Sequence, residues 1–378
     1  PVVPGTEEPF AADVPDAILT AEAARIGYPL VVKAVAGGGG KGMRSVDAPA
    51  DLLAAIRTAR SEAGSAFGNP AVYLERKLLR SRHIEIQLLG DAYGTVVPFV
   101  ERECSIQRRH QKVVEESPSL ALSQDTRRAM AECAAAVART VGYTNAGTIE
   151  FLLDEAGSFY FLEMNTRLQV EHPVTEMVTG IDLVHWQLRI AMGERLTIDP
   201  ERALTPRTHA IECRIYAEDP DQGFMPSPGL VRAISVPGGP GVRDDRGVAP
   251  GFEIPLFYDS MIAKLIVWGD TRTEAIGRLG RVLDEYRVIG VRTTLPFFRW
   301  LVSQPEFVEG AFDTAYLDAL LASRKGQPFV EVTAADGDDA AIIAAVSTFL
   351  RVHQAAGGAP AASTSGAWHR RARMEALR

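Results

Sequence analysis

Hydrophobic residues recur along the chain with two different periods, which divide it into expected helices and strands. Apolar positions three or four residues apart predict helices, and short runs rich in β-branched and aromatic residues predict strands. Helices are expected at 14–27, 51–63, 123–141, 181–192, 271–286 and 295–303. Strands are expected at 30–36, 43–46, 72–79, 82–89, 96–100, 148–153 and 158–164, and most of 206–268 is also expected to be strand. The pattern predicts an α/β (α+β) protein with a mixed or antiparallel sheet late in the chain.

The helix expected at 123–141 has clear signals at both ends. Ser123 is placed to cap the first turn, and Gly142 follows the last one. The predicted buried stripe of this helix consists of Ala129, Cys133, Ala136, Val137 and Thr140. Cys133 is therefore expected in the core and not in a catalytic role.

The stretch 147–176 combines two expected strands, a turn at 154–158 and a polar segment that leads into a helix. Glu150 and Glu163 lie inside the two apolar strands. A buried charge is costly unless it is paired or binds a metal. If the chain stays extended after Glu163, the side chains that follow at steps of two lie on the same face. These side chains are Asn165, Arg167, Gln169 and Glu171.

This set of polar side chains suits one kind of chemistry. Two carboxylates and an amide oxygen are ligands that Mg²⁺ prefers. Arg167 offers a planar fork to a small oxyanion, and Glu171 remains as a candidate base. A surface strand with solvated charges is the alternative for any one of these residues, but six polar groups in one register favour a shared site.

A glycine-rich segment follows the strand expected at 30–36. Lys33 lies at the centre of that strand, and Gly37, Gly38, Gly39 and Gly40 come directly after it. The spacing does not fit the Walker A pattern, and another strand follows instead of a helix. The glycines are expected to form a flap whose backbone N–H groups could close on phosphates, with a flexible turn as the alternative. A buried Lys33 needs an anionic partner, which favours the phosphate site.

Two further regions carry candidate ligands. The strand at 72–79 is expected to join two lobes, where Glu75 is either a hydrogen-bond acceptor in an ATP cleft or a solvated edge charge. His83 either reaches a phosphate or is structural. The segment 101–119 is dense in charge and is either a solvated loop or a source of anion ligands. Its candidate ligands are Gln107, His110 and Lys112.

Composition narrows the possible classes of protein. The chain has 378 residues, 46% hydrophobic and 23% charged, which is an ordinary globular mixture. The net charge of −8 argues against a nucleic-acid-binding surface. No apolar run reaches the roughly 18 residues of a membrane span. The three scattered cysteines fit a reducing cytoplasm and exclude a cysteine zinc site.

The chain becomes looser in composition from residue 324 onward. One helix is expected at 340–354, and an Ala/Gly/Pro/Ser-rich linker at 355–366. The basic stretch at 367–378 resembles the beginning of a further module.

Several motifs together resemble biotin carboxylase, and most of all the biotin carboxylase part of an acyl-CoA carboxylase α subunit of the acetyl-/propionyl-CoA type. The motifs lie at 26–43, 82–87, 101–119, 147–152, 161–176 and 258–266, and the resemblance covers residues 1–320. It implies an ATP-grasp fold. The domains implied are a flap lobe with the end of an N-terminal lobe linker at 1–78, a large lobe at 79–205, a biotin carboxylase C-terminal domain at 206–323, and a linker with the start of a carboxyltransferase-docking region at 324–378.

The resemblance also implies roles for individual residues. ATP would be bound by Lys33, Gly37–Gly40, Met43, Glu75, Arg76, Leu78, His83, Gln107 and His110. Metal ligands would be Glu150, Glu163 and Asn165. Bicarbonate would be held by Lys112, Arg167, Gln169, Val170 and Glu171. Glu171 would be the general base, and Arg243 would steady the biotin enolate.

The implied reaction is the ATP-dependent carboxylation of biotin by bicarbonate. Glu171 would deprotonate bicarbonate, which attacks the γ-phosphate of MgATP to give carboxyphosphate, and Arg243 would hold the ureido oxygen of biotin as charge builds on it. The implied cofactors are ATP, Mg²⁺ or Mn²⁺, and biotin attached to a separate carrier domain. The implied partners are that carrier domain, a second copy of the chain and a carboxyltransferase β subunit, with no nucleic acid and no membrane.

Two departures from the family pattern accompany the resemblance. The family has an N-terminal subdomain with a further ATP-contacting lysine, so this sequence is either a fragment or one from which that part is omitted. The Ala-Met-Lys-Met motif for biotin attachment is missing, so the biotinyl domain is expected downstream or on another chain.

Other functions stay open at this point. The module of pyruvate carboxylase or urea carboxylase is an alternative. Another ATP-grasp ligase, such as a carbamoyl phosphate synthetase lobe, is disfavoured by the block at 241–266. A non-enzymatic scaffold is the third alternative, although each carried-over site residue is intact.

Overall fold

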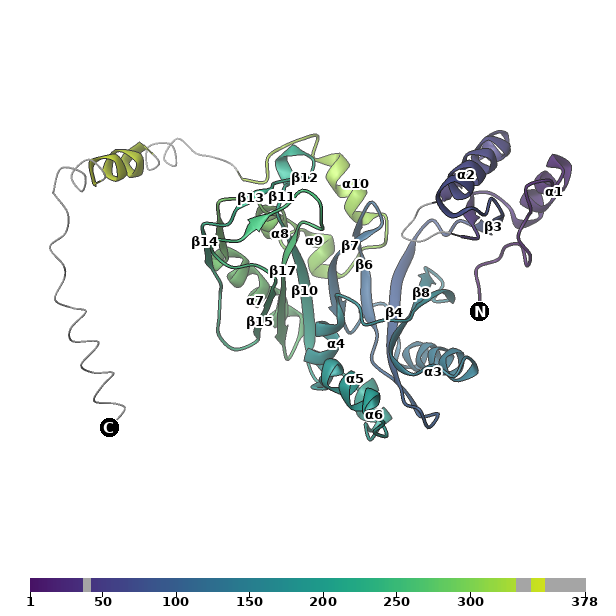
Figure 1. The fold of residues 1–378 in the computed structure, drawn as a ribbon, viewed down its shortest axis with the longest axis horizontal. Coiled ribbons are helices and arrows are strands. Elements are labelled where there is room, and N and C mark those ends of the chain that lie inside the picture. The colour runs from purple at the N-terminus through teal and green to yellow at the C-terminus, as the bar shows by residue number, and fades with distance from the viewer. Residues whose placement is uncertain (37–41, 331–340, 351–378) are drawn as a thin grey trace. The chain divides into compact units, whose positions relative to one another are not determined.

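Two sheets of different size organise residues 1–327, which form one compact unit of the computed structural model (Figure 1). The structure describes residues 1–36, 42–330 and 341–350. The smaller sheet consists of β1 (Leu30–Ala34), β2 (Met43–Val46) and β3 (Val72–Arg76), in the order β2-β1-β3. Both of its strand pairs are antiparallel. The strand expected at 43–46 is therefore confirmed, and the strands expected at 30–36 and 72–79 are shorter than predicted.

Two helices cover the smaller sheet and share its core. They are α1 (Asp16–Ile26) and α2 (Leu52–Phe67), the latter preceded by the short 3₁₀ helix η1 (Pro49–Asp51). Leucine and isoleucine side chains from both helices pack against β1 and β3 with almost no solvent exposure. The glycines at 37–40, expected as a phosphate flap, lie outside the described residues.

The larger sheet contains nine strands and carries most of the candidate site residues. They are β4 (Ser81–Gly90), β5 (Val96–Pro98), β6 (Arg102–Arg108), β7 (Gln111–Ser117), β8 (Asn145–Asp154), β9 (Phe159–Asn165), β10 (His209–Tyr216), β15 (Val242–Arg246) and β17 (Met261–Gly269). Their order is β15-β17-β10-β7-β6-β4-β8-β9, with β5 paired to β4, and adjacent strands are antiparallel. The expected late antiparallel sheet thus continues the sheet formed by earlier strands, because β10 pairs with β7.

Helices and short strands complete the unit around the larger sheet. The helices are α3 (Gln124–Thr140), α4 (His172–Thr179), α5 (Leu183–Ala191), α6 (Pro200–Leu204), α7 (Arg272–Glu285), α8 (Leu295–Leu301), α9 (Pro305–Glu309) and α10 (Tyr316–Ser323), with the 3₁₀ helix η2 (Pro220–Gln222). The short strands are β11 (Glu218–Asp219), β12 (Met225–Pro226), β13 (Gly229–Leu230), β14 (Ala233–Ser235), β16 (Glu253–Ile254) and β18 (Arg287–Ile289). Val174 and Val178 of α4 pack against Ala210 of β10 and Ile266 of β17, which places the start of α4 beside the centre of the sheet (Figure 1).

The segment 101–119 does not form the solvated loop that was one of its two predicted alternatives. It forms the buried hairpin β6–β7, and most of its charged side chains are inside the protein. The buried charges are tolerated because they pair with one another and with neighbouring strands.

The end signals of α3 are confirmed, but its predicted buried stripe was wrong at three of five positions. The Ser123 side chain accepts a hydrogen bond from the backbone N–H of Thr126, and Gly142 has a φ of +60° beyond the last turn. The buried residues are Met130, Ala131, Ala134, Ala135 and Ala138. Cys133 and Val137 are half-buried against the core, whereas Ala129, Ala136 and Thr140 are exposed. Alanine lines several faces of this helix, so the sequence offers little contrast between them.

A second unit begins at Pro328, and the structure describes residues 328–330 and 341–350 of it. Residues 341–350 within it are helical, in agreement with part of the helix expected at 340–354, and the rest of that range lies outside the described residues. No helix of the described residues is long and apolar enough to cross a membrane.

Candidate active site

A cluster of buried charges lies where β4, β7 and β8 meet the start of α4. At its centre, the Lys112 ammonium lies 2.5 Å from Glu85, 2.9 Å from Glu150 and 2.7 Å from Glu171. These three carboxylates are at most 5% exposed. Burial opposes the charge on Lys112, but the carboxylates, with Glu85 foremost, raise its pKa well above the ordinary value. All three N–H donors of Lys112 can thus be used on carboxylate oxygens.

Arg102 of β6 has no exposed surface and connects the strands beneath this cluster. Its Nε donates to Glu85, and its two Nη atoms donate to Gln87 at 2.9 Å, Thr175 at 3.0 Å, Thr148 at 3.1 Å and Gln169 at 3.1 Å. Burial opposes the charge on Glu85, but Arg102 and Lys112 lower its pKa to about 2. The guanidinium therefore has an acceptor for each of its five N–H groups.

Glu150 and Gln169, predicted from spacing to share a face, do meet in the structure. The Gln169 amide donates to Glu150 Oε1 at 2.8 Å, and His83 Nε2 lies 3.2 Å from Glu150 Oε2. Burial would raise the pKa of Glu150, but His83 and Lys112 hold it well below its usual range. Glu150 is therefore ionised at neutral pH.

Glu171, the candidate base, lies at the position that precedes α4 and is 2% exposed. One oxygen accepts from Lys112, and the other accepts from Arg214 at 2.9 Å. Burial and the nearby Glu85 carboxylate raise its pKa, but the cations Lys112 and Arg214 outweigh them and lower it. Glu171 is thus held as a carboxylate, which is the form that a general base needs.

Sequence reasoning missed several members of the cluster. They are Glu85, Arg102, Glu115, Glu212 and Arg214. Each is a charged residue inside a buried strand, the same signal that singled out Glu150 and Glu163. In the strands β4 and β10, however, charged and apolar residues alternate. This alternation is typical of a half-buried strand with a solvated face, so the sequence gives no reason to place these charges in a site.

Glu163, Asn165 and Arg167 form a separate, more exposed group at the end of β9. Glu163 lies opposite Glu150 in the strand register, and the Asn165 amide donates to Glu163 at 3.5 Å. Arg167 is exposed and donates to Asn165 at 3.4 Å. The expectation of one extended face was wrong beyond Asn165, because β9 ends there and the chain turns toward α4. Arg167 is consequently exposed, whereas Gln169 is buried.

In the smaller sheet, the structure brings Lys33 and Glu75 together. Lys33 Nζ lies 3.0 Å from Glu75 Oε2 and 3.1 Å from Oε1, and both side chains are about one-quarter exposed. Lys33 is thus half-buried and not enclosed in a strand core as predicted. Met43 is opposite Lys33 in the register and is partly exposed.

The other expected nucleotide ligands have partners of their own. The Arg76 N–H donates to the Pro4 carbonyl at 2.8 Å, and β3 ends at Arg76, so Leu78 lies in the link to β4. The Gln107 amide donates to the Cys104 carbonyl at 2.9 Å. His110 is exposed in the turn between β6 and β7 with a φ of +65°.

Arg243 of β15 is held between two carboxylates. Its Nε and Nη2 donate to the two oxygens of Asp245, each at 2.8 Å, and its Nη1 donates to Glu176 at 2.7 Å. Lys264 lies 3.5 Å from Asp245 and donates to the Val170 carbonyl at 3.0 Å. Arg243 is therefore joined to the Gln169–Glu171 turn through Asp245 and Lys264.

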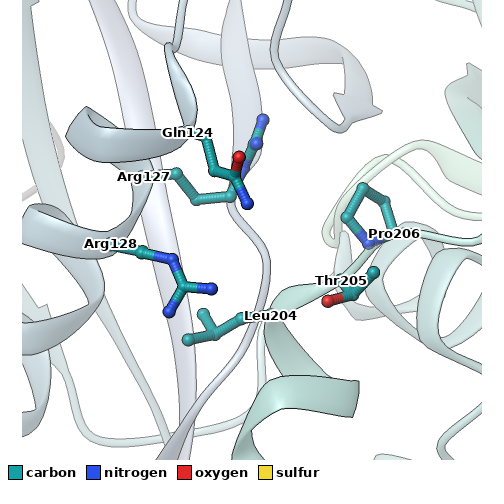
Figure 2. A pocket seen from close by; sticks show the side chains of 6 residues that line it. All are labelled: Gln124, Arg127, Arg128, Leu204, Thr205 and Pro206. Atoms are coloured by element: carbon teal, nitrogen blue, oxygen red, sulfur yellow. The ribbon is translucent and has the colours of Figure 1, made fainter.

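A small pocket beside α3 lies apart from these groups. Figure 2 shows its lining, which consists of Gln124, Arg127, Arg128, Leu204, Thr205 and Pro206. Arg127 is already paired with Glu101, and Arg128 with Glu201. Both cations of the pocket are thus already paired with carboxylates. The buried cluster around Lys112 is therefore the candidate active site.

Comparisons with known proteins identify the family of this chain. The family "Carbamoyl-phosphate synthase L chain, ATP binding domain" matches residues 1–199, and "Biotin carboxylase C-terminal domain" matches 212–319. Biotin carboxylase from Nostoc sp. is 50% identical over 320 residues, which are 85% of this chain and 71% of that protein. The chain belongs to the biotin carboxylase family.

Other biotin carboxylase relatives belong to different carboxylases. A pyruvate carboxylase subunit of Methanothermobacter thermautotrophicus is 50% identical over 84% of this chain and 64% of its own length. The methylcrotonoyl-CoA carboxylase α subunit of Dictyostelium discoideum is 42% identical over 93% of this chain and 49% of its own length. The chain thus spans between about half and 71% of these relatives.

Solved biotin carboxylase structures confirm the expected ATP-grasp fold. The Campylobacter jejuni biotin carboxylase, solved with an ATP analogue, has a TM-score of 0.80 and 44% identity over 84% of this chain and 70% of its own. The biotin carboxylase domain of the Hydrogenobacter thermophilus 2-oxoglutarate carboxylase has a TM-score of 0.81 and 44% identity over 88% of this chain and 72% of its own. It was solved as a dimer with MgADP and bicarbonate.

Several residues of the chain fit a hard divalent cation. Glu150 and Glu163 face each other across β8 and β9, and the Asn165 amide lies beside them, with its nitrogen donating to Glu163 and its oxygen accepting from Arg167. Oxygen donors of this kind suit Mg²⁺. The structure also places Glu85 and His83 near Glu150, with ligand atoms within 4.8 Å of one another. Carboxylates therefore dominate the donor set, although one of the neighbouring groups is an imidazole.

Proposed function

We propose that this chain catalyses the ATP-dependent carboxylation of biotin by bicarbonate through carboxyphosphate, the first half-reaction of an acyl-CoA carboxylase. The observation that supports it most is the ionised, buried Glu171, which is held between Lys112 and Arg214. A buried carboxylate of this kind can accept a proton from an acidic substrate that enters the site. Membership of the biotin carboxylase family supports bicarbonate as that substrate.

The bicarbonate cradle would consist of Lys112, Arg167, Gln169 and the backbone of Val170. Lys112 and Gln169 are fixed by the buried cluster, whereas Arg167 is exposed and makes only weak contacts. Bicarbonate would replace carboxylate acceptors of Lys112 with its own oxygens, and its proton would pass to a Glu171 oxygen. The bicarbonate oxygen then attacks the γ-phosphorus of ATP, and ADP leaves.

The nucleotide would lie between the ligand residues of the smaller sheet and those of the larger sheet. Lys33, the glycines at 37–40, Met43, Glu75, Arg76, Leu78, His83, Gln107 and His110 remain the proposed ATP ligands. Mg²⁺ would be held by Glu150, Glu163 and Asn165 and would offset phosphate charge when bound. Phosphate binding requires Lys33 to exchange its Glu75 partner for the nucleotide.

Arg243 is proposed to steady the ureido oxygen of biotin. Asp245 and Glu176 accept from all of its side-chain nitrogens, which orients the guanidinium before biotin arrives. Biotin would be delivered on a carrier domain, and the carboxyl group would then pass to the carboxyltransferase. The dimer form of the Hydrogenobacter domain supports a homo-oligomer.

The length of the match to one relative favours an acyl-CoA over pyruvate as the acceptor of the carboxyl group. The methylcrotonoyl-CoA carboxylase relative matches over 356 residues, whereas the pyruvate carboxylase relative matches over 318. The longer match reaches into the tail that follows the biotin carboxylase region. A pyruvate carboxylase module is the second candidate, because its identity of 50% is the higher one.

Phosphate release from MgATP with bicarbonate, with and without free biotin, tests the proposal. The assay is run on the full-length protein and on its Glu171→Gln variant. Biotin-stimulated release that Glu171→Gln abolishes is expected. Release that is indifferent to biotin would indicate another ATP-grasp ligase, and no release from the full-length protein would support the scaffold alternative. Transfer of the carboxyl group to an acyl-CoA or to pyruvate distinguishes the two acceptors.

A further inference from the structure

Arg214 of β10 joins the candidate base to a second buried carboxylate. Its Nη2 lies 2.9 Å from Glu171 Oε2 and 2.5 Å from Glu115 Oε1, and its Nε donates to Glu115 at 2.6 Å. Arg214 is 9% exposed, Glu171 2% and Glu115 not at all. A single guanidinium thus serves two buried carboxylates, only one of which faces the proposed bicarbonate cradle.

Glu212 lies directly opposite Glu115 in the register of β7 and β10 and is also fully buried. Neither oxygen of Glu212 has a hydrogen-bond partner among the described residues, and Glu115 Oε2 has none either. Two adjacent buried carboxylates with three oxygens lacking donors cannot both carry charge at an acceptable free energy. One proton between them would supply the missing donor.

We propose that Arg214 is a positioning residue for the base Glu171, and that Glu212 is kept as a neutral carboxylic acid beside the Glu115 carboxylate. The Arg214 charge is then divided between Glu115 and Glu171, and a Glu212 proton is available to Glu115 Oε2. The inference rests on the proposed function, because it takes Glu171 as the base.

The electrostatic surroundings agree with this assignment of the proton. Burial and the neighbouring Glu115 raise the pKa of Glu212 well above its ordinary value. Burial also raises the pKa of Glu115 to about 7, with Arg214 acting against that rise. Glu115 is thus the acid of the pair that ionises first, and it is the one bonded to Arg214.

Other charged and titratable groups also face this arrangement. Around Glu171 they are Glu85, Arg102 and Lys112, and around Arg214 they are Tyr216 and Lys264, with Lys264 opposite Arg214 in the strand register. Cys104 and Cys213 lie nearby, and burial raises the pKa of both thiols well above the ordinary value. Lys112 retains its bond to Glu171 if Arg214 is removed, so the base keeps one cation.

The test compares Arg214→Met with the double variant Glu115→Gln/Arg214→Met. The activity of the full-length protein, as kcat/KM for bicarbonate, is measured against pH. Loss of the Arg214 charge raises the pKa of Glu171. The acid limb of the pH profile is therefore expected to move to higher pH by about one unit or more. The double variant removes both members of the buried ion pair, so it keeps the test valid if Arg214→Met alone does not fold.

The double variant separates a positioning role from a merely structural one. If Arg214 served only to neutralise Glu115, the double variant would show the parent's pH profile, and the proposal would be overturned. The proposal requires that the acid limb stay shifted in the double variant. A parent protein without biotin-dependent phosphate release would instead refute the proposed function, so the two failures are distinguishable.

Glu116→Gln is the matched control. Glu116 is adjacent to Glu115 on β7 and is also buried, but its partners are His209 and Arg272. Its substitution is expected to leave the acid limb in place.

Infrared difference spectra of Glu212→Gln against the parent provide a second readout. The parent is expected to show the carbonyl band of a protonated carboxylic acid at neutral pH, and Glu212→Gln is expected to lose it. A parent without that band would contradict the neutral Glu212.

Discussion

Replacing Arg102 with methionine removes a fully buried cation and keeps an unbranched side chain in its place. The change leaves the Glu85 carboxylate with Lys112 as its remaining hydrogen-bonded cation and takes donors away from Gln87 and Gln169. All three side chains are at most 5% exposed, so water cannot replace the lost donors without opening the sheet. The substitution therefore leaves the buried Glu85 carboxylate with one hydrogen-bonded cation in place of two.

The loss of one partner of a buried ion pair costs about 3–5 kcal/mol. If residues 1–327 unfold together, an unfolding entropy of about 2.1 cal/mol/K per residue gives about 0.7 kcal/mol/K for this unit. The expected drop in melting temperature of Arg102→Met is then about 4–7 °C, from the same two magnitudes. Gln169 also loses its Arg102 donor, so the KM for bicarbonate is expected to rise.

A double variant sharpens this prediction. Glu85→Gln in the Arg102→Met background removes the carboxylate that has lost its Arg102 partner, so part of the lost stability is expected to return, since two neutral groups need no counter-charge. Melting is followed by circular dichroism at a fixed scan rate, because unfolding of a protein of this size can be irreversible. Arg128→Met, at an exposed pair with Glu201, is the control and is expected to change the melting temperature little.

Two results would refute the reasoning about Arg102. One is an Arg102→Met protein as stable as the Arg128→Met control, which would mean that the buried network relaxes without cost. The other is a double variant that is less stable than Arg102→Met by the full effect of Glu85→Gln alone, which would mean that the two side chains do not act as a pair.

Further predictions concern the backbone, a helix cap and pH. Gly90→Ala places a Cβ 2.3 Å from the Tyr143 carbonyl oxygen and is expected to lower the free energy of unfolding by about 1–3 kcal/mol, while Gly277→Ala, in open space on α7, is expected to raise it by about 0.5–1 kcal/mol; urea unfolding measures both. Ser123→Ala removes the α3 cap and is expected to cost about 1 kcal/mol in the same assay, and an unchanged midpoint would contradict the cap. Because the folded pKa of Glu85 is about 2, its contribution to stability is complete above its ordinary pKa of 4.5 and is lost as the pH falls toward 2; a pH titration of the urea midpoint should show this loss, and Glu85→Gln should reduce it.

Much of the fold follows from local pattern. The strand at 43–46 matches in both bounds, and the helices at 14–27 and 271–286 match within one or two residues at each end. These elements have one polar and one apolar face, or clear caps, so the sequence alone carries the signal. The stripe of α3 failed because alanine occupies both its buried and its exposed faces.

The hairpin β6–β7 shows what local pattern cannot decide. Its segment 101–119 has the composition of a solvated loop, yet its side chains are buried because partners from β4, β8 and β10 neutralise them. Those partners are distant in sequence, so a rule that reads only the local run of charges predicts a solvated segment. For the same reason, local pattern does not single out Arg214 and Glu212 in an alternating strand.

The proposed site has a buried floor and an exposed rim, and this division follows from the same sheet. Lys112, Gln169 and Glu171 are fixed in the floor by ion pairs and hydrogen bonds, so they need little reorganisation when charge develops beside them. Glu163 and Arg167 lie on the rim and lose side-chain entropy when a ligand orders them. A substrate that bridges the two parts would offset this cost through binding, whereas the acid–base properties of Glu171 are set in advance by the strands beneath it.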